Sequence, residues 1–194
     1  MNILVDLLPE TIEVDGDKYA INSDFRTGIL FEELMLDNKL LDKEKAAIAL
    51  RLYYKVIPHD IDLAIEKIKW FYMTGKEPEK VSGGNEGPAN KEKRIYSYEH
   101  DAEYIYTAFL SQYGVDLQDI ERLHWWKFKA MFLGLKEDNL IVKIMGYRSM
   151  KITNDMSKEQ KKFYKQMKKV YGIPDLRSES EKEIDFHDSL GSLL

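Results

Sequence analysis

The residues best suited to chemistry are Glu121 and His124, which form a Glu-x-x-His pair in the middle of the chain. On a helix this spacing places a carboxylate and an imidazole on one face, as carboxylate-bridged di-metal centres require. Such a centre needs two of these pairs and two further carboxylates, and only one pair is present. We therefore expect a surface Glu121 and a partly buried, hydrogen-bonded His124, with a di-metal carboxylate enzyme as the weaker alternative.

Other kinds of catalytic site find little support. The chain has no cysteine, which excludes a thiol nucleophile, a disulfide and a zinc-thiolate site. The glycine-rich stretch 82–87 lacks the lysine spacing of a phosphate-binding loop, and no strand pattern precedes it. No Gly-x-Ser-x-Gly motif is present. We expect a protein that is not an enzyme and that uses no metal or cofactor.

The Glu-x-x-His pair lies in a stretch, 116–135, whose apolar residues recur at helical period. Asp116 is the expected N-cap and Gly134 the expected stop. Two residues break the pattern, since Trp125 projects into the polar stripe and Lys127 into the apolar face. Either a neighbouring element covers Trp125 while the Lys127 stem runs along apolar surface, or Trp125 is an anchor for a partner.

The segment Leu123–Phe132, Leu-His-Trp-Trp-Lys-Phe-Lys-Ala-Met-Phe, resembles the "gene product fifteen" family of siphophages that infect Gram-positive bacteria. The stretches 98–114 and 144–148 support the resemblance. It implies a small, helical, non-enzymatic protein similar to a tail assembly chaperone, which coats or solubilises the tape measure protein while the tail tube polymerises. From helix projection and this motif, we expect a surface for the client or for self-assembly made by Trp125, Trp126, Lys127, Phe132, Tyr147 and Arg148.

Composition limits the remaining function classes. In 194 residues, 44% are apolar and 32% are charged, which is enough for a core and a well-solvated surface, so we expect a soluble protein. The net charge of -5 argues against a nucleic-acid partner. No apolar run is long enough to cross a membrane, and the patch 3–8 lacks the basic start of a secretory signal. We therefore expect neither nucleic acid nor membrane as a partner.

The pattern predicts a mainly α fold of about six or seven helices with an N-terminal β-hairpin. Alternating residues around Asp15-Gly16 predict the hairpin, whose apolar face must pack on helices or pair with another copy. Predicted helices span 25–36, 43–56 (capped by Asp42), 60–73, 98–113, 116–135, 139–150 and 157–171. The fourth and fifth form a helical hairpin around residues 98–135.

The predicted organisation is a hairpin with three helices in 1–74, a linker or mobile loop in 75–94, a helical region in 95–174 and a tail in 175–194. One domain with a long loop and two joined lobes both remain open. The last helix is basic and amphipathic, which is typical of a solvated face over a core stripe and less often of a contact with an acidic partner. The acidic tail is expected to be disordered when isolated, and its apolar residues could dock on the basic helix or on a partner.

The predicted function is therefore a phage tail assembly chaperone. Its expected partners are the tape measure protein, further copies of this chain and, as another candidate, the major tail tube protein. We expect it in the cytoplasm of the infected bacterium or lysogen and not in the mature virion. The main alternative is a structural tail or neck component that stays in the particle.

Overall fold

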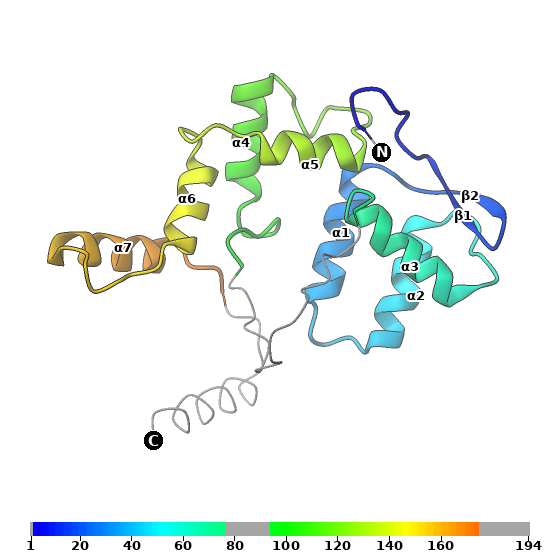
Figure 1. The fold of residues 1–194 in the computed structure, drawn as a ribbon, viewed down its shortest axis with the longest axis horizontal. Helices are drawn as coiled ribbons and strands as arrows, with labels where there is room; N and C mark the ends of the chain where they lie inside the picture. The colour runs from blue at the N-terminus through cyan, green and yellow to red at the C-terminus, as the bar shows by residue number, and fades with distance from the viewer. Residues whose placement is uncertain (1, 77–93, 175–194) are drawn as a thin grey trace.

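The computed structural model describes residues 2–76 and 94–174, which form one short hairpin and seven helices (Figure 1). This confirms the mainly α prediction with an N-terminal hairpin. The predicted linker falls mostly, and the acidic tail wholly, outside the described residues. The elements are β1 (Thr11–Val14), β2 (Asp17–Ala20), α1 (Phe25–Leu36), α2 (Asp42–Tyr53), α3 (Ile61–Tyr72), α4 (Ala102–Tyr113), α5 (Trp125–Leu133), α6 (Leu140–Ser149) and α7 (Lys158–Val170).

The β-hairpin forms where the Asp15-Gly16 pair predicts it. Both turn residues have positive φ, 50° and 83°, as a type I′ turn requires. The register pairs Ile12 with Tyr19, and Ile12 and Val14 are buried on the face that meets α3. After the hairpin, Ile21 pairs with Tyr54 at the end of α2. The apolar face of the hairpin is thus covered within the chain.

Helix α2 packs against both α1 and α3, and the three helices surround a cluster of aromatic side chains. Phe31, Tyr53 and Phe71 meet edge to face at centroid distances of 5.4 and 5.9 Å. The prediction that Asp42 caps α2 is wrong, because Leu41 is the N-cap and Asp42 is the first helical residue. The Glu44 carboxylate accepts the Leu41 N–H at 2.8 Å and does the capping instead.

The predicted central helix begins eight residues later than expected, because its N-cap is His124 and not Asp116. Just before and at Trp125, backbone groups that a longer helix would use in its own hydrogen bonds are bonded to another segment of the chain. Leu123 N–H donates to the Asp24 carboxylate at 3.0 Å, Leu123 C=O accepts from Phe25 at 2.8 Å, and Trp125 N–H donates to Ser23 C=O at 2.7 Å. These bonds across the chain replace the i to i−4 bonds of a helix. Asp116 caps only a local turn, through Gln118 N–H at 2.8 Å.

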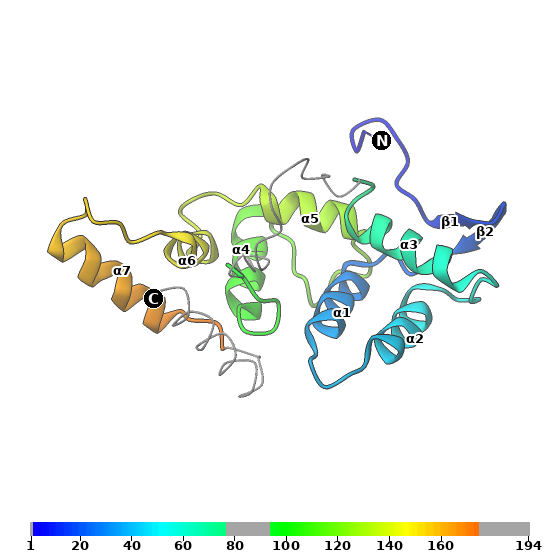
Figure 2. The same ribbon diagram turned by 60° about the horizontal axis from the view of Figure 1, so that its bottom comes forward.

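Helix α5 ends at Gly134, as predicted, and lies between the two halves of the chain. Figures 1 and 2 both show α1–α3 on one side of it, α4 and α6 on the other, and α7 at the far end of the molecule. Buried residues from α1, α3, α4, α5 and α6 belong to one apolar cluster. None of the described helices is long and apolar enough to cross a membrane.

Candidate partner-binding site

Four of the six predicted contact residues are buried in the structure. Trp125 is 0% exposed, and Trp126, Phe132 and Arg148 are at most 9% exposed. The expectation that these four side chains form an outer surface is therefore wrong. Lys127 is exposed and Tyr147 is half-buried, so these two remain accessible to a partner.

Trp125 is enclosed because α1 approaches it closely at Gly28. A Cβ at Gly28 would lie 2.3 Å from Trp125 Cε3, so only glycine leaves room for the ring. The indole stacks on Tyr72 at a centroid distance of 5.3 Å and on Phe128 at 5.7 Å. Helix projection alone places Trp125 on a polar stripe. The residue is nevertheless buried because α1 covers it, as the interpretation of cover by a neighbouring element predicts.

The two neighbouring tryptophans of α5 hold the end of α3. Helix α3 closes with a Schellman motif, in which Gly75 N–H donates to Trp70 C=O at 2.9 Å and Thr74 N–H donates to Phe71 C=O at 3.0 Å. Trp125 Nε1–H donates to Tyr72 C=O at 2.9 Å, and Trp126 Nε1–H donates to Phe71 C=O at 2.7 Å. The Trp125 indole thus bonds a carbonyl in the last turn of α3, where intrahelical donors run out, and the Trp126 indole adds a donor to the Phe71 carbonyl, which also accepts from Thr74.

His124 caps the start of α5 with its side chain. Its Nδ1 accepts Trp126 N–H at 3.1 Å, so the ring proton is on Nε2, which donates to Pro9 C=O at 3.1 Å. Burial lowers the pKa of His124, and Arg122 and Lys127 add to this effect while Pro9 and Glu10 oppose it. The ring is therefore a neutral capping group. Because both nitrogens are engaged, the Glu121/His124 metal alternative has no ring nitrogen available in this conformation.

Metal-binding potential is also limited elsewhere in the described ranges. Within 2–76 and 94–174, no three His, Cys, Asp or Glu side chains come close enough to hold an ion. Glu121 is exposed, as predicted.

A lysine in an aromatic surrounding lies beside Trp125 and was not found by sequence reasoning. Lys129 Nζ is 5.3 Å from the Trp125 ring centroid, 5.9 Å from Tyr72 and 6.0 Å from Tyr96. Burial lowers the pKa of Lys129, and the charge of Glu32 opposes that shift. Tyr72 donates its hydroxyl proton to the same Glu32 carboxylate. The cluster of Glu32, Tyr72 and Lys129 thus links α1, α3 and α5, which is a structural role.

Arg148 forms a buried ion pair that was likewise unforeseen. Its two terminal nitrogens donate to the Asp101 oxygens at 2.5 and 2.8 Å, a bidentate geometry. Arg148 also donates to Ile95 C=O at 3.0 Å and to Tyr171 C=O at 2.6 Å. These bonds tie α6 to the start of α4 and to the end of α7. Arg148 is therefore a structural residue inside the chain.

Among the described helices, α7 alone has no buried residue. Ser157 and Gln160 form a capping box, with bonds of 3.1 and 2.9 Å, so the helix starts where predicted. Tyr147 of α6 meets Phe163 at 5.8 Å and Tyr171 at 6.1 Å between centroids. Phe163 remains 45% exposed and Val170 61% exposed. Among the pairs of elements in substantial contact, α7 pairs with α6 alone.

The charge of α7 sets it apart from the rest of the chain. Between Lys158 and Val170 there are six lysines and one glutamate, a formal charge of +5, while the whole chain carries -5. Lys161 and Lys168 donate to nearby backbone carbonyls at 3.0 and 2.6 Å. The partly exposed aromatic and apolar side chains of α7 thus form a stripe with lysines along it. The helix lies at one end of the molecule (Figure 2).

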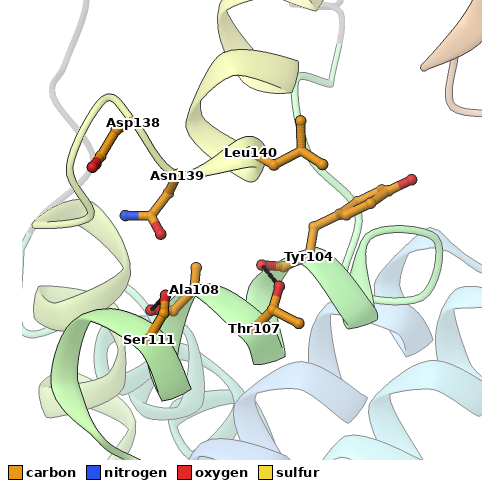
Figure 3. Close-up of a pocket in the computed structure, with 7 residues that line it drawn as sticks. All are labelled: Tyr104, Thr107, Ala108, Ser111, Asp138, Asn139 and Leu140. Atoms are coloured by element: carbon orange, nitrogen blue, oxygen red, sulfur yellow. Dashed lines mark hydrogen bonds between the residues drawn. The ribbon is translucent and has the colours of Figure 1, made fainter.

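A shallow pocket of about 330 Å³ lies between α4 and the start of α6 (Figure 3). The Thr107 hydroxyl donates to the Glu103 and Tyr104 carbonyls, and the Ser111 hydroxyl donates to the Ala108 carbonyl. Asn139 donates to Gln112 at 2.8 Å and to Lys136 C=O at 3.2 Å. Asp138 is the one ionisable acid among the lining residues. The pocket presents no pair of groups suited to acid and base catalysis.

We use "α7 face" below for the stripe formed by Tyr147, Phe163, Tyr164, Met167, Val170 and Tyr171. It is the best candidate site for a partner because it is apolar, partly exposed and built on a capped helix.

No curated protein and no solved structure matches this chain. A family model described as "Bacteriophage Gp15 protein" matches residues 4–173, which include both the Leu123–Phe132 motif and the α7 face. The match covers nearly the whole described chain, and the protein therefore belongs to the bacteriophage Gp15 family.

Proposed function

We propose that this protein is a tail assembly chaperone that binds the phage's tape measure protein and keeps it soluble while the tail is built. The single observation that carries the proposal is the open α7 face. Membership of a bacteriophage family supplies the biological setting, and the client follows from the family resemblance.

The α7 face suits a client that presents an amphipathic helix. Such a helix can lay its apolar side on a partly exposed aromatic stripe, which shields it from water. The exposed parts of Phe163 and Val170 would become buried, at about 25 cal/mol for each Å² of apolar surface removed from water. The lysines along the stripe favour a client segment with acidic flanks.

The proposed role involves binding and no catalytic turnover. A tape measure protein is much longer than one α7 face, so several copies of this chain would bind along it. Self-association on the client is part of the proposal, and the major tail tube protein is a further candidate partner. The protein would act in the cytoplasm of the infected bacterium or lysogen.

The test is co-expression of this chain with the phage's tape measure protein, followed by size-exclusion chromatography with light scattering. We expect a soluble complex with several copies of this chain per client, while the client expressed alone is insoluble. An insoluble client beside free monomeric chain would contradict the proposal.

Mass spectrometry of purified phage particles tests the location of the protein. A chaperone that leaves before the tail is complete should be absent from the particle. Detection at the copy number of known tail proteins would favour the alternative of a structural tail or neck component.

A further inference from the structure

The α7 face lacks a cover within the described residues, although its helix is well formed. Helix α7 contacts α6 through Tyr147, and its terminal Tyr171 reaches Tyr104 of α4 at 6.4 Å between centroids. Phe163 and Val170 still expose about half of their surface or more. A segment that carries both acidic and apolar side chains would complement the lysines and the apolar stripe of α7.

The sequence that follows α7 has the complementary chemistry. Residues 175–194 lie outside the described part of the chain, and they hold six acidic and two basic residues, a formal charge of -4. Six large apolar residues lie among and after these acids. They are Leu176, Ile184, Phe186, Leu190, Leu193 and Leu194.

Position and length allow this segment to reach the α7 face. The described chain stops at Pro174, three residues after Tyr171, where the stripe ends. Helix α7 has 13 residues and is therefore about 20 Å long. A segment of 20 residues can run back along that distance with chain to spare.

We propose that residues 175–194 bind the α7 face of their own chain and compete there with the client. The acidic side chains pair with the α7 lysines, and the apolar residues cover Phe163 and Val170. Because the segment is tethered directly to the helix, its effective concentration is in the millimolar range, about what a short linker provides. A client must displace it, so free chaperone copies keep their apolar stripe covered. The competition rests on the proposed function, whereas the docking itself does not.

Hydrogen exchange of the full-length chain tests the docking without any client. The variant replaces Ile184, Phe186 and Leu190 by Ser, and the matched control replaces Leu4, Val5 and Leu7, which are exposed apolar residues of the N-terminal arm, by Ser. We expect α7 amides to exchange about tenfold faster in the tail variant, with α1 to α5 unchanged. The control should leave α7 exchange at the wild-type rate. Equal α7 exchange in wild type and tail variant would overturn the proposal.

Protein concentration separates the chain's own segment from that of a second copy. Docking within one chain predicts α7 protection that is unchanged over about a hundredfold dilution, with a monomer in light scattering. Protection that falls on dilution would assign the α7 face to a second copy and would overturn the proposal.

Co-expression with the tape measure protein then tests the competition. The tail variant should retain several-fold more client than wild type at equal expression. Equal α7 exchange in wild type and tail variant, together with normal client binding by wild type, would overturn this inference and leave the proposed function standing. Docking without any client binding would do the reverse.

Discussion

Helices α5 and α7 are similar in composition but differ in how much of their surface is buried in the structure. Both combine aromatic residues with lysines, yet α5 buries Trp125, Trp126, Phe128 and Phe132 whereas α7 buries nothing. Helix α5 carries the segment that resembles the family most specifically, and this segment organises the fold. The comparison teaches that a distinctive aromatic motif can mark a structural centre, while the proposed binding surface lies on a less distinctive helix.

The difference arises from what each helix meets. Helix α5 is covered by α1 at Gly28, by the end of α3 through two indole hydrogen bonds, and by α4 through Phe109, whose ring stacks on Phe128 at 4.9 Å. Helix α7 follows a short loop and meets mainly α6. Burial is thus decided by partners that are distant in sequence and not by the apolar content of the helix itself.

The largest expected difference between α5 and α7 is the loss of stability when one aromatic side chain is truncated in each helix. Trp125→Ala removes a fully buried indole and its bond to Tyr72, so we expect a loss of about 3–5 kcal/mol in the free energy of unfolding. Phe163→Ala in α7 removes a ring that is 45% exposed and should cost less than about 1 kcal/mol. Urea denaturation followed by circular dichroism measures both. Equal losses would show that the two helices are not buried differently.

The second effect concerns the close approach of α1 to α5. Gly28→Ala places a Cβ against the Trp125 ring, at 2.3 Å before relaxation, and should destabilise the chain by about 1–3 kcal/mol. Gly146→Ala is the matched control in helix α6, because no atom lies within 4 Å of the added Cβ. That control should be neutral or stabilise by up to about 1 kcal/mol. A tolerated Gly28→Ala, measured by the same denaturation, would argue that Trp125 is not enclosed.

A smaller effect follows from the cap of α5. The pKa of His124 is lowered by burial, so as the pH falls below 6.5 the unfolded chain binds a proton before the folded chain does. Stability contributed by neutral His124 is therefore present above pH 6.5 and is lost between 6.5 and the lower pKa of the folded chain. His124→Asn keeps an N-cap acceptor without a titrating proton, and its stability should fall less between about pH 7.5 and about pH 5 than that of wild type.

The control for this pH effect is His59→Asn, at an exposed histidine. Its stability should follow the pH dependence of wild type. If His124→Asn and wild type lose the same free energy of unfolding on acidification, the capping role assigned to neutral His124 is wrong.

Local signals in the sequence were sufficient for most of the fold. Asp15-Gly16 predicts the hairpin, Gly134 predicts the end of α5, and the predicted helix 157–171 matches α7, all as observed. These features depend on a few neighbouring residues, whose turn and cap preferences are strong.

The errors arise where distant segments meet. The start of α5 depends on hydrogen bonds from 23–25 to 123–125, and Arg148 finds Asp101 at a separation of 47 residues. Neither contact leaves a periodic signal. For the same reason, helix projection of Trp125 does not anticipate the space that Gly28 leaves, and the surroundings of Lys129 require three helices and the segment at Tyr96 to be in place.

The most direct test of the central claim is to measure client binding and stability in the same two variants. Phe163→Ser with Val170→Ser alters the α7 face, and Leu30→Ser with Ile48→Ser alters two residues of similar exposure on α1 and α2. Each variant is co-expressed with the tape measure protein, and the client that co-purifies per chain is quantified beside the free energy of unfolding. We expect the α7 variant to lose at least about tenfold of the client at unchanged stability, and the α1/α2 variant to retain it. Equal client retention by both variants would contradict the assignment of the binding surface to α7.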